Sequence, residues 1–387
     1  MEIITYHWRT LDMVHFHEHL HQKSIECRVG IFPLCILFTI GNGTEASKII
    51  DTKSDCLMEK ILITGSSGFI GSFLVDQALK NGLKVYAGVR NSSSRKYLKD
   101  ERINFFETDF SDLNLLRKKL GDIEFDYVIH NAGVVKVNKK TAFFTYNYEL
   151  TKNFAEILKE VQPDLKKFTY ISSAAAYGPA DNHPGEIVRE EDTPRPIDTY
   201  GESKLAAEKW LKGQTGFPYL IFRPTGVYGP RETEIFTFFK AFNQGFEGHI
   251  GRKPQKMSFI YVKDLVRLIL EATQSEIARK AYFVSDGKAY PTQELGVLAA
   301  KILDKKPLVK VNVPIAVVRV LAALGEGYGK LSGTIPALNL EKLKTLKSKN
   351  WQCDIAPLKN DFNFAPSYDL EEGLKETIQW YKENNWL

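Results

Sequence analysis

The stretch Lys60-Ile-Leu-Ile-Thr-Gly-Ser-Ser-Gly-Phe-Ile-Gly71 decides the fold. Its first five residues predict a short strand, and its three glycines follow the pattern G-x-x-G-x-x-G ahead of a helical pattern at 73–80. Gly65 permits a tight turn, Gly68 lets a pyrophosphate approach the backbone, and Gly71 allows the helix to pack closely on the strand. The free N–H groups at the start of the helix would hold the phosphates. A glycine-rich loop without a ligand is the alternative, but the strand–turn–helix context favours dinucleotide binding.

Strand and helix patterns alternate onward from this turn. Apolar runs at 85–89, 103–106, 127–129, 168–171 and 219–222 predict strands, and the patterns at 112–120, 145–161 and 200–212 predict helices. Because crossover helices pack on both faces of parallel strands, the expected class is α/β, a Rossmann-type doubly wound parallel sheet. After Gly229 the alternation breaks up, and helices are expected at 265–272, 292–303, 315–324 and 370–384. We therefore expect a dinucleotide-binding Rossmann domain at 58–229. Residues 230–387 should form mainly a smaller C-terminal substrate-binding lobe, with some elements returning to the Rossmann sheet.

The first 57 residues differ from the rest of the chain. They hold three of the four cysteines and five of the eight histidines. The alternating histidines of 15–21 could share one face of a strand and bind a metal, but no matching ligands follow at a recognisable spacing, so we expect no metal site. The run at 31–40 has the hydrophobicity of a signal-peptide core but lacks a clear cleavage site. We interpret residues 1–57 as an extension that is disordered or not translated, with Met58 as the functional start.

The composition is that of a globular protein, with 43% hydrophobic and 26% charged residues among 387. It excludes a disordered chain, a collagen-like repeat and a disulfide-stapled miniprotein. A net charge of +5 gives no support for nucleic acid binding. No apolar run is long enough for a membrane span, and we interpret the apolar stretch at 311–324 as a buried helix. One cysteine, Cys353, remains after Met58, which fits a reducing cytoplasm. We expect a cytoplasmic protein without a nucleic acid or membrane partner.

Tyr200-Gly-Glu-Ser-Lys204 places a phenol and an ammonium one helical turn apart on the same face. A free tyrosine has a pKa near 10, and a neighbouring cation would lower it toward the range useful for proton transfer at neutral pH. Taken alone the pair is a weak signal, because both residues are frequent on solvated helices. Ser172 and Ser173 strengthen it, because they follow the fifth strand and should face the same crevice as the glycine turn.

Five motifs in order now resemble those of a known family. They are TGSSGFIG at 64–71, HNAG at 130–133, ISSAAAYG at 171–178, YGESK at 200–204 and RPTGVYGPRE at 223–232. The chain resembles the extended short-chain dehydrogenase/reductase family of the NAD-dependent epimerase/dehydratase type. The likeness runs from Met58 to Leu387 and is strongest to the dihydroflavonol reductase and 3β-hydroxysteroid dehydrogenase branch.

The resemblance implies a role for each matching residue. Tyr200 would exchange a proton with the substrate oxygen, Lys204 would bind the nicotinamide ribose and lower the tyrosine pKa, and Ser173 would hydrogen-bond the reacting carbonyl or alcohol. Asn147 matches an asparagine behind the site with a structural or proton-relay role. The expected cofactor-binding residues are Gly65, Ser67, Gly68, Phe69, Ile70, Gly71, Arg90, Asp109, Phe110, Asn131, Ala132, Gly133, Tyr200, Lys204, Pro224 and Thr225. Asn131 and Asp109 could equally serve ordinary turns and caps.

Two departures from the family pattern narrow the function. Sugar dehydratases carry an Asp-Glu pair after the catalytic serine, where this chain has Ala174 and Ala175, so dehydration is not expected. NAD enzymes place an acid at the end of the second strand, where this chain has Arg90. The arginine favours NADP as cofactor, although NAD remains possible.

Three functions stay open. The leading hypothesis is an NAD(P)-dependent oxidoreductase that interconverts a ketone and a secondary alcohol on a moderately bulky substrate of sterol-, flavonol- or sugar-like type. The alternatives are a nucleotide-sugar 4-epimerase with tightly bound NAD and a non-catalytic cofactor sensor.

The resemblance also suggests a homodimer through the helices at 145–161 and 200–212. In the loop 180–197, His183 is expected to be solvated rather than in contact with substrate.

Overall fold

The computed structural model describes residues 58–137, 139–250, 255–332 and 340–387. The histidine run at 15–21 and the apolar run at 31–40 therefore lie outside the described residues. Among the helices of the described ranges, none has both the length and the hydropathy that crossing a membrane requires.

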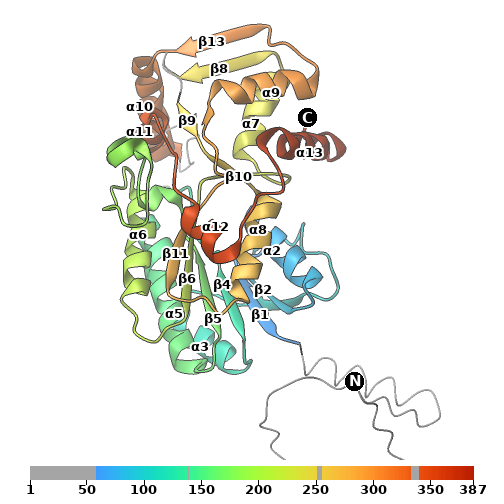
Figure 1. Ribbon diagram of the computed structural model, residues 1–387, viewed down its shortest axis with the longest axis vertical. Coiled ribbons are helices and arrows are strands. Elements are labelled where there is room, and N and C mark those ends of the chain that lie inside the picture. The colour runs from blue at the N-terminus through green and yellow to red at the C-terminus, as the bar shows by residue number, and fades with distance from the viewer. Residues whose placement is uncertain (1–57, 138, 251–254, 333–339) are drawn as a thin grey trace, which may run out of the picture. The chain divides into compact units, whose positions relative to one another are not determined.

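A seven-stranded parallel sheet forms the centre of the structure (Figure 1). Its order is β11-β6-β5-β4-β1-β2-β3, and every neighbouring pair is parallel. The strands are β1 (Lys60–Thr64), β2 (Lys84–Val89), β3 (Asn104–Glu107), β4 (Tyr127–His130), β5 (Lys167–Ile171), β6 (Tyr219–Pro224) and β11 (Lys280–Val284). The chain proceeds outward from β1 in one direction and from β4 in the other, so the topological switch point of the sheet lies at the carboxyl ends of these two strands. The predicted fold class is confirmed.

Helices cover both faces of the sheet because its strands are apolar on both sides. The helices α2 (Phe69–Lys80), α8 (Val262–Thr273) and α12 (Ala356–Phe362) cover one face. The other face carries α3 (Leu113–Gly121), α5 (Leu150–Val161) and α6 (Thr199–Lys212). Within β1, Ile61 and Ile63 belong to the first core and Leu62 to the second, as alternation along a strand requires.

The helix expected at 145–161 is built in three parts. A short α4 (Thr141–Phe144) leads into a π-helical turn (Thr145–Glu149), and α5 continues from there. The hydrophobic pattern could not predict this, because a single π turn adds only one residue to an otherwise helical stretch.

Other described residues from Gly226 onward lie outside the sheet, in a part of the fold with its own aromatic core, which includes Tyr228, Phe239 and Tyr381. Its helices are α7 (Glu234–Asn243), α9 (Gln293–Leu303), α10 (Ile315–Ser332), α11 (Leu340–Lys347) and α13 (Leu370–Glu383). Three two-stranded ribbons complete it: β7 (Gly226–Tyr228) with β10 (Phe259–Tyr261), β9 (Lys256–Met257) with β12 (Tyr290–Pro291), and β8 (Phe246–Ile250) with β13 (Val309–Val313).

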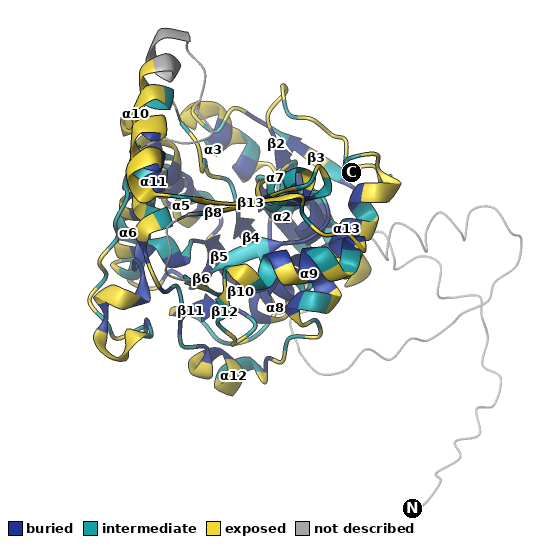
Figure 2. Cartoon of the chain, turned by 90° about the horizontal axis from the view of Figure 1, so that it is seen from above, coloured by how far each residue is buried: buried dark blue, intermediate teal, exposed yellow. Residues whose placement is uncertain are grey.

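The helix expected to be buried at 315–324 is not. In α10, Val318 and Ala322 are buried, but Val317, Val320, Leu321 and Leu324 are between 47 and 65% exposed. Figure 2 accordingly colours most of α10 as exposed. The prediction was wrong because only one of the two apolar faces of this helix packs on the protein.

Candidate active site

The glycine turn lies between β1 and α2, and its backbone conformation requires glycine. Gly65 has a φ of +68°, and a side chain there would come within 2.9 Å of the backbone of Ala132. A Cβ on Gly71 would lie 2.1 Å from the carbonyl oxygen of Gly65. The Gly68 N–H closes the turn onto the same oxygen at 3.1 Å. Because Gly68 at the N-cap of α2 has no side chain to cap the helix, the first-turn N–H groups suit an anion, as a pyrophosphate cradle requires.

The other candidate residues also follow strands of the sheet. Arg90 comes after β2, Asp109 and Phe110 after β3, Asn131 to Gly133 after β4, and Ser172–Ser173 after β5. Pro224 ends β6, and the backbone N–H and hydroxyl of Thr225 both donate to Val284 at the end of β11. Since the strands are parallel, all these positions lie at one edge of the sheet together with the glycine turn. Ser67, Phe69 and Ile70 lie within the turn or at the start of α2.

Tyr200 and Ser173 meet at this edge. Tyr200 lies in the first turn of α6, where Asp198 caps the helix by accepting a 2.7 Å hydrogen bond from the N–H of Gly201. The Ser173 side chain lies close enough to the Tyr200 hydroxyl to lower its pKa through hydrogen bonding. Ser173 itself is held by the N–H of Ala175, which donates to its hydroxyl oxygen at 3.2 Å. The two hydroxyls thus converge although 26 residues of sequence separate them.

The pKa of Tyr200 shifts upward in the structure, opposite to the direction expected from its lysine. Desolvation raises this pKa to about 12, while the hydrogen bond with Ser173 lowers it and the charge of Asp198 raises it. Lys204 is buried, and its ammonium donates to the carbonyl oxygen of Ile171 at 2.9 Å. The Lys204 ammonium is therefore hydrogen-bonded to the end of β5 rather than to the phenol of Tyr200.

Lys204 and Asn147 close around Gly133. A Cβ on Gly133 would lie 3.3 Å from the Lys204 nitrogen and 3.0 Å from Oδ1 of Asn147. Burial lowers the pKa of Lys204 to about 8, and the charge of Glu208 opposes this shift. The Lys204 ammonium also lies 4.9 Å from the centre of the Tyr170 ring. An ammonium with a pKa this close to neutrality is unusual, and such groups concentrate at functional sites.

Asn147 is fully buried in the π turn and joins two elements of the site. Its Oδ1 accepts from the N–H of Val134 at 2.8 Å, and its Nδ2 donates to the carbonyl oxygen of Val134 at 3.0 Å and to Ser203 Oγ at 3.1 Å. The backbone carbonyl of Asn147 accepts from the hydroxyl of Thr151 at 2.9 Å. With these bonds the amide connects the loop after β4 to α6, next to Lys204.

The residues expected at the adenosine end of the cofactor are more exposed. Arg90 is exposed, and its charge contributes to lowering the pKa of Asp109, for which hydrogen bonds from Ser111 are the larger cause. Arg95 forms a 2.5 Å ion pair with Glu107, and Lys96 lies over the rings of Tyr97 and Trp386. Of these three cations, Arg90 lies nearest to the end of β2.

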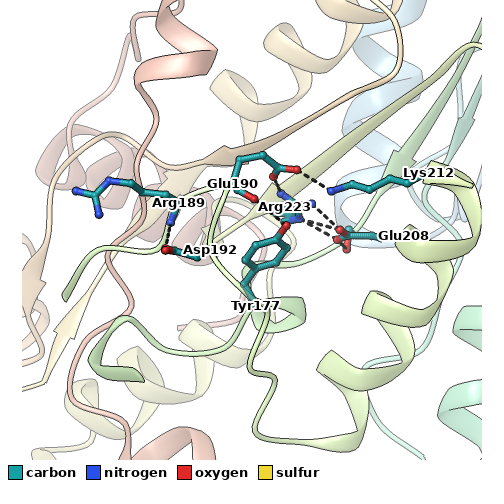
Figure 3. A network of polar contacts seen from close by, with 8 residues as sticks. Tyr177, Arg189, Glu190, Asp192, Glu208, Lys212 and Arg223 are labelled. Atoms are coloured by element: carbon teal, nitrogen blue, oxygen red, sulfur yellow. Dashed lines mark hydrogen bonds and ion pairs between the residues drawn. The ribbon is translucent and has the colours of Figure 1, made fainter. Parts of the chain in front are cut away.

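A buried charge network behind the site was missed by the sequence analysis (Figure 3). Arg223 has no exposed surface, and its guanidinium donates to Glu208 from Nε at 2.9 and 3.0 Å and from Nη2 at 2.6 Å. Glu208 also accepts from the hydroxyl of Ser172. Glu190 accepts from Arg223 on its other side and from Lys212 at 2.6 Å. The available signal was the spacing of Tyr200, Lys204 and Glu208, which puts all three on one face of α6.

His183 is buried rather than solvated, contrary to expectation. Its Nε2 lies 3.0 Å from the carbonyl oxygen of Tyr177, and its Nδ1 lies 3.6 Å from Asp192. The loop 180–197 therefore folds back onto the protein. Within the described ranges, no three His, Cys, Asp or Glu side chains form a group that could hold a metal ion.

A doubly wound parallel sheet with a glycine turn at its switch point defines a dinucleotide-binding protein of the Rossmann class. A family model described as "NAD dependent epimerase/dehydratase family" matches residues 61–284, and the chain belongs to this family. The members of the family are NAD-dependent enzymes, and this supports an enzymatic function for the chain.

Relatives of this chain carry out more than one reaction. A UDP-glucose 4-epimerase of Vibrio cholerae is 28% identical over 84% of this chain and 97% of its own length. A ceramide reductase of Caulobacter vibrioides is 23% identical over 84% of this chain and 96% of its own. Among solved structures, MoeE5 in complex with UDP-glucuronic acid and NAD superposes with a TM-score of 0.66 and 21% identity, over 84% of this chain and 99% of that one. The last comparison supports the fold.

Proposed function

We propose that the protein is an NAD(P)-dependent oxidoreductase that interconverts a ketone and a secondary alcohol on a moderately bulky small molecule. The convergence of Ser173, Tyr200 and Lys204 at the sheet edge that carries the glycine turn is the observation behind this proposal. NAD(P), when bound, supplies the hydride acceptor or donor. Gly65, Gly68 and Gly71 would hold its pyrophosphate, and the exposed Arg90 would bind a 2′-phosphate.

Each side chain has a distinct role in the proposed reaction. Ser173 hydrogen-bonds the reacting oxygen of the substrate, and Tyr200 gives that oxygen a proton during reduction or takes it during oxidation. Burial raises the pKa of Tyr200 to about 12, so the phenol is protonated at neutral pH and can donate a hydrogen bond to the substrate oxygen. Lys204 contacts the ribose of the cofactor beside Gly133. Asn147 acts as a positioning residue, because its amide already connects Val134 to Ser203.

A nucleotide-sugar 4-epimerase is the second candidate, favoured by the 28% identity to the Vibrio cholerae enzyme over nearly its whole length. The two functions differ in how the cofactor is held. An epimerase would be purified with tightly retained NAD and would change no net amount of NADH, whereas a reductase would consume exchangeable NADPH. Ala174 and Ala175 have no group that transfers protons, so we do not propose dehydration.

The test is a panel of ketones and nucleotide sugars assayed for NADPH and NADH turnover. Tyr200→Phe should lower kcat by about a hundredfold or more, while the Kd of the cofactor hardly changes, because the phenol contacts mainly the reacting oxygen. Tyr146→Phe is the matched control. It removes the hydroxyl of a tyrosine that is 44% exposed, and it should leave kcat unchanged. Near-normal turnover by Tyr200→Phe would remove the basis of the assignment.

A further inference from the structure

The β8–β13 ribbon has its polar side toward the protein. The register pairs Val309 with Phe246, Lys310 with Glu247 and Val311 with Gly248, so each pair lies on one face of the ribbon. Glu247 is 4% exposed, bonds Lys310 at 3.0 Å, and lies so close to Gly296 of α9 that a Cβ there would be 2.2 Å away. The polar face of the ribbon therefore packs on α9.

The opposite face is apolar and faces solvent. Because successive side chains of a strand alternate, Phe246, Val309 and Val311 point away from α9, and they are 56, 43 and 43% exposed. Leu308, just before β13, is 88% exposed. This arrangement reverses the usual one, in which the apolar face of a ribbon is covered.

The next element along the chain also exposes apolar side chains. Only Pro314 separates β13 from α10, and Val317, Val320, Leu321 and Leu324 form a stripe at helical spacing. All four side chains are 47 to 65% exposed, whereas Val318 and Ala322 make the packed face of the helix. We call the eight residues Phe246, Leu308, Val309, Val311, Val317, Val320, Leu321 and Leu324 the apolar face. So many exposed apolar side chains on consecutive elements mark an interaction surface.

The charge of this part of the chain indicates what binds there. Residues 301–349 contain ten lysines and arginines against three acids, Asp304, Glu326 and Glu341, which is a net +7 where the whole chain has +5. Lys305 and Lys306, which precede Pro307 and Leu308, are exposed and lie next to the apolar face. Lys310 lies on the polar face of the ribbon, where it pairs with Glu247. A second copy of this chain would bring like charges together, whereas an anionic surface is attracted.

We propose that the apolar face docks the protein onto the surface of a membrane that contains anionic phospholipids. The apolar side chains insert among the lipids at the level of the headgroups, and the lysines at the border of the face contact the phosphates. This is peripheral binding without a membrane span. It departs from the expectation of no membrane partner, and it is independent of the proposed reaction.

The test is co-sedimentation of the full chain with vesicles, without cofactor or substrate. The protein should bind phosphatidylcholine vesicles that contain phosphatidylglycerol, bind pure phosphatidylcholine much less, and be released as NaCl is raised. The double variants Leu321→Glu/Leu324→Glu and Phe246→Ser/Val309→Ser should each lower the apparent affinity by about tenfold or more. Leu113→Glu/Leu115→Glu adds the same charges at exposed leucines in the first turn of α3 and should bind like the wild type.

Several results would overturn the proposal. These are the absence of binding to anionic vesicles, or binding that neither apolar-face variant weakens. A concentration-dependent dimer that Leu321→Glu/Leu324→Glu dissociates, without vesicle binding, would instead make this face an interface between copies. If Leu321→Glu/Leu324→Glu raised the KM for a bulky ketone and left vesicle binding unchanged, α10 would be assigned to the substrate site instead.

Discussion

Glu208→Gln tests the buried charge network behind the candidate site. The substitution preserves the shape of the side chain and removes the negative charge of Glu208. In the wild type, Nε and Nη2 of Arg223 donate hydrogen bonds to this carboxylate. Burial alone would lower the pKa of Arg223, but Glu208 and Glu190 raise it above its usual value. The guanidinium stays charged in the variant even without Glu208, because arginine is always charged in proteins. Removing one partner of a buried pair typically costs 3–5 kcal/mol, because it leaves a charge without compensation.

Two remaining contacts of Arg223 reduce the loss of stability in Glu208→Gln. Glu190 still pairs with Arg223, although this carboxylate is 34% exposed and shared with Lys212, and the guanidinium still lies 4.2 Å from the Tyr177 ring centre. We therefore expect Glu208→Gln to lower the free energy of unfolding by about 3 kcal/mol, toward the low end of that range. The measurement is urea unfolding followed by circular dichroism.

Two further variants make the test specific. Glu190→Gln should cost about 1 kcal/mol or less, as expected for a partly exposed pair. In Glu208→Gln/Arg223→Met both charges of this buried pair are removed, so the double variant should be more stable than Glu208→Gln alone. A loss below about 1 kcal/mol in Glu208→Gln, or no recovery in the double variant, would refute the reasoning.

The same substitution has a consequence for pH dependence. The charge of Glu208 raises the pKa of Lys204, so its removal should lower that pKa further below about 8. Lys204 would then lose its proton at a lower pH than in the wild type. Any activity that needs the ammonium should decline earlier as the pH rises, and a kcat profile measured between neutral and alkaline pH would show the shift.

The remaining predictions concern cofactor binding and the start of the chain. A protein of residues 58–387 should fold and keep its cofactor affinity, and loss of solubility would argue against Met58 as the functional start. Arg90→Ala should weaken NADP by about ten- to a hundredfold and NAD much less, measured as Kd by titration, whereas equal weakening would assign Arg90 to the adenosine. Gly71→Ala should weaken both cofactors by about tenfold or more, because its Cβ meets the Gly65 oxygen at 2.1 Å. Gly121→Ala, where a Cβ meets nothing within 4 Å and φ is not positive, is its control, and equal affinities in the two variants would contradict the cradle.

The sheet could be predicted from sequence because its signals are local. Each strand is a short apolar run, and the turn after β1 needs glycine at positions 65 and 71 for reasons that hold in any chain of this fold. The convergence of Ser173 with Tyr200 followed from one rule, that the carboxyl ends of parallel strands share an edge. Neither inference required knowledge of the side-chain contacts in the folded protein.

The missed features depend on contacts between distant segments. The burial of His183 depends on the fold of its loop against Tyr177, and the exposure of α10 depends on which of its two apolar faces finds a partner. The pKa of Tyr200 was expected to fall because Lys204 is one turn away on the helix. In the structure that lysine donates to Ile171 at the end of β5, which no spacing within α6 reveals.

The π turn at Thr145–Glu149 makes the length of this segment as important as its composition. It contains one residue more than an α-helical path would need, and the carbonyl of Asn147 accepts from Thr151 Oγ1 at 2.9 Å. Deleting one residue here would restore a regular helix and rotate the residues before the deletion by about 100° relative to α5. Asn147 would then turn away from Val134 and Ser203. A homologue one residue shorter at this point can therefore keep every motif of the family and still lack the bridge between the loop after β4 and α6.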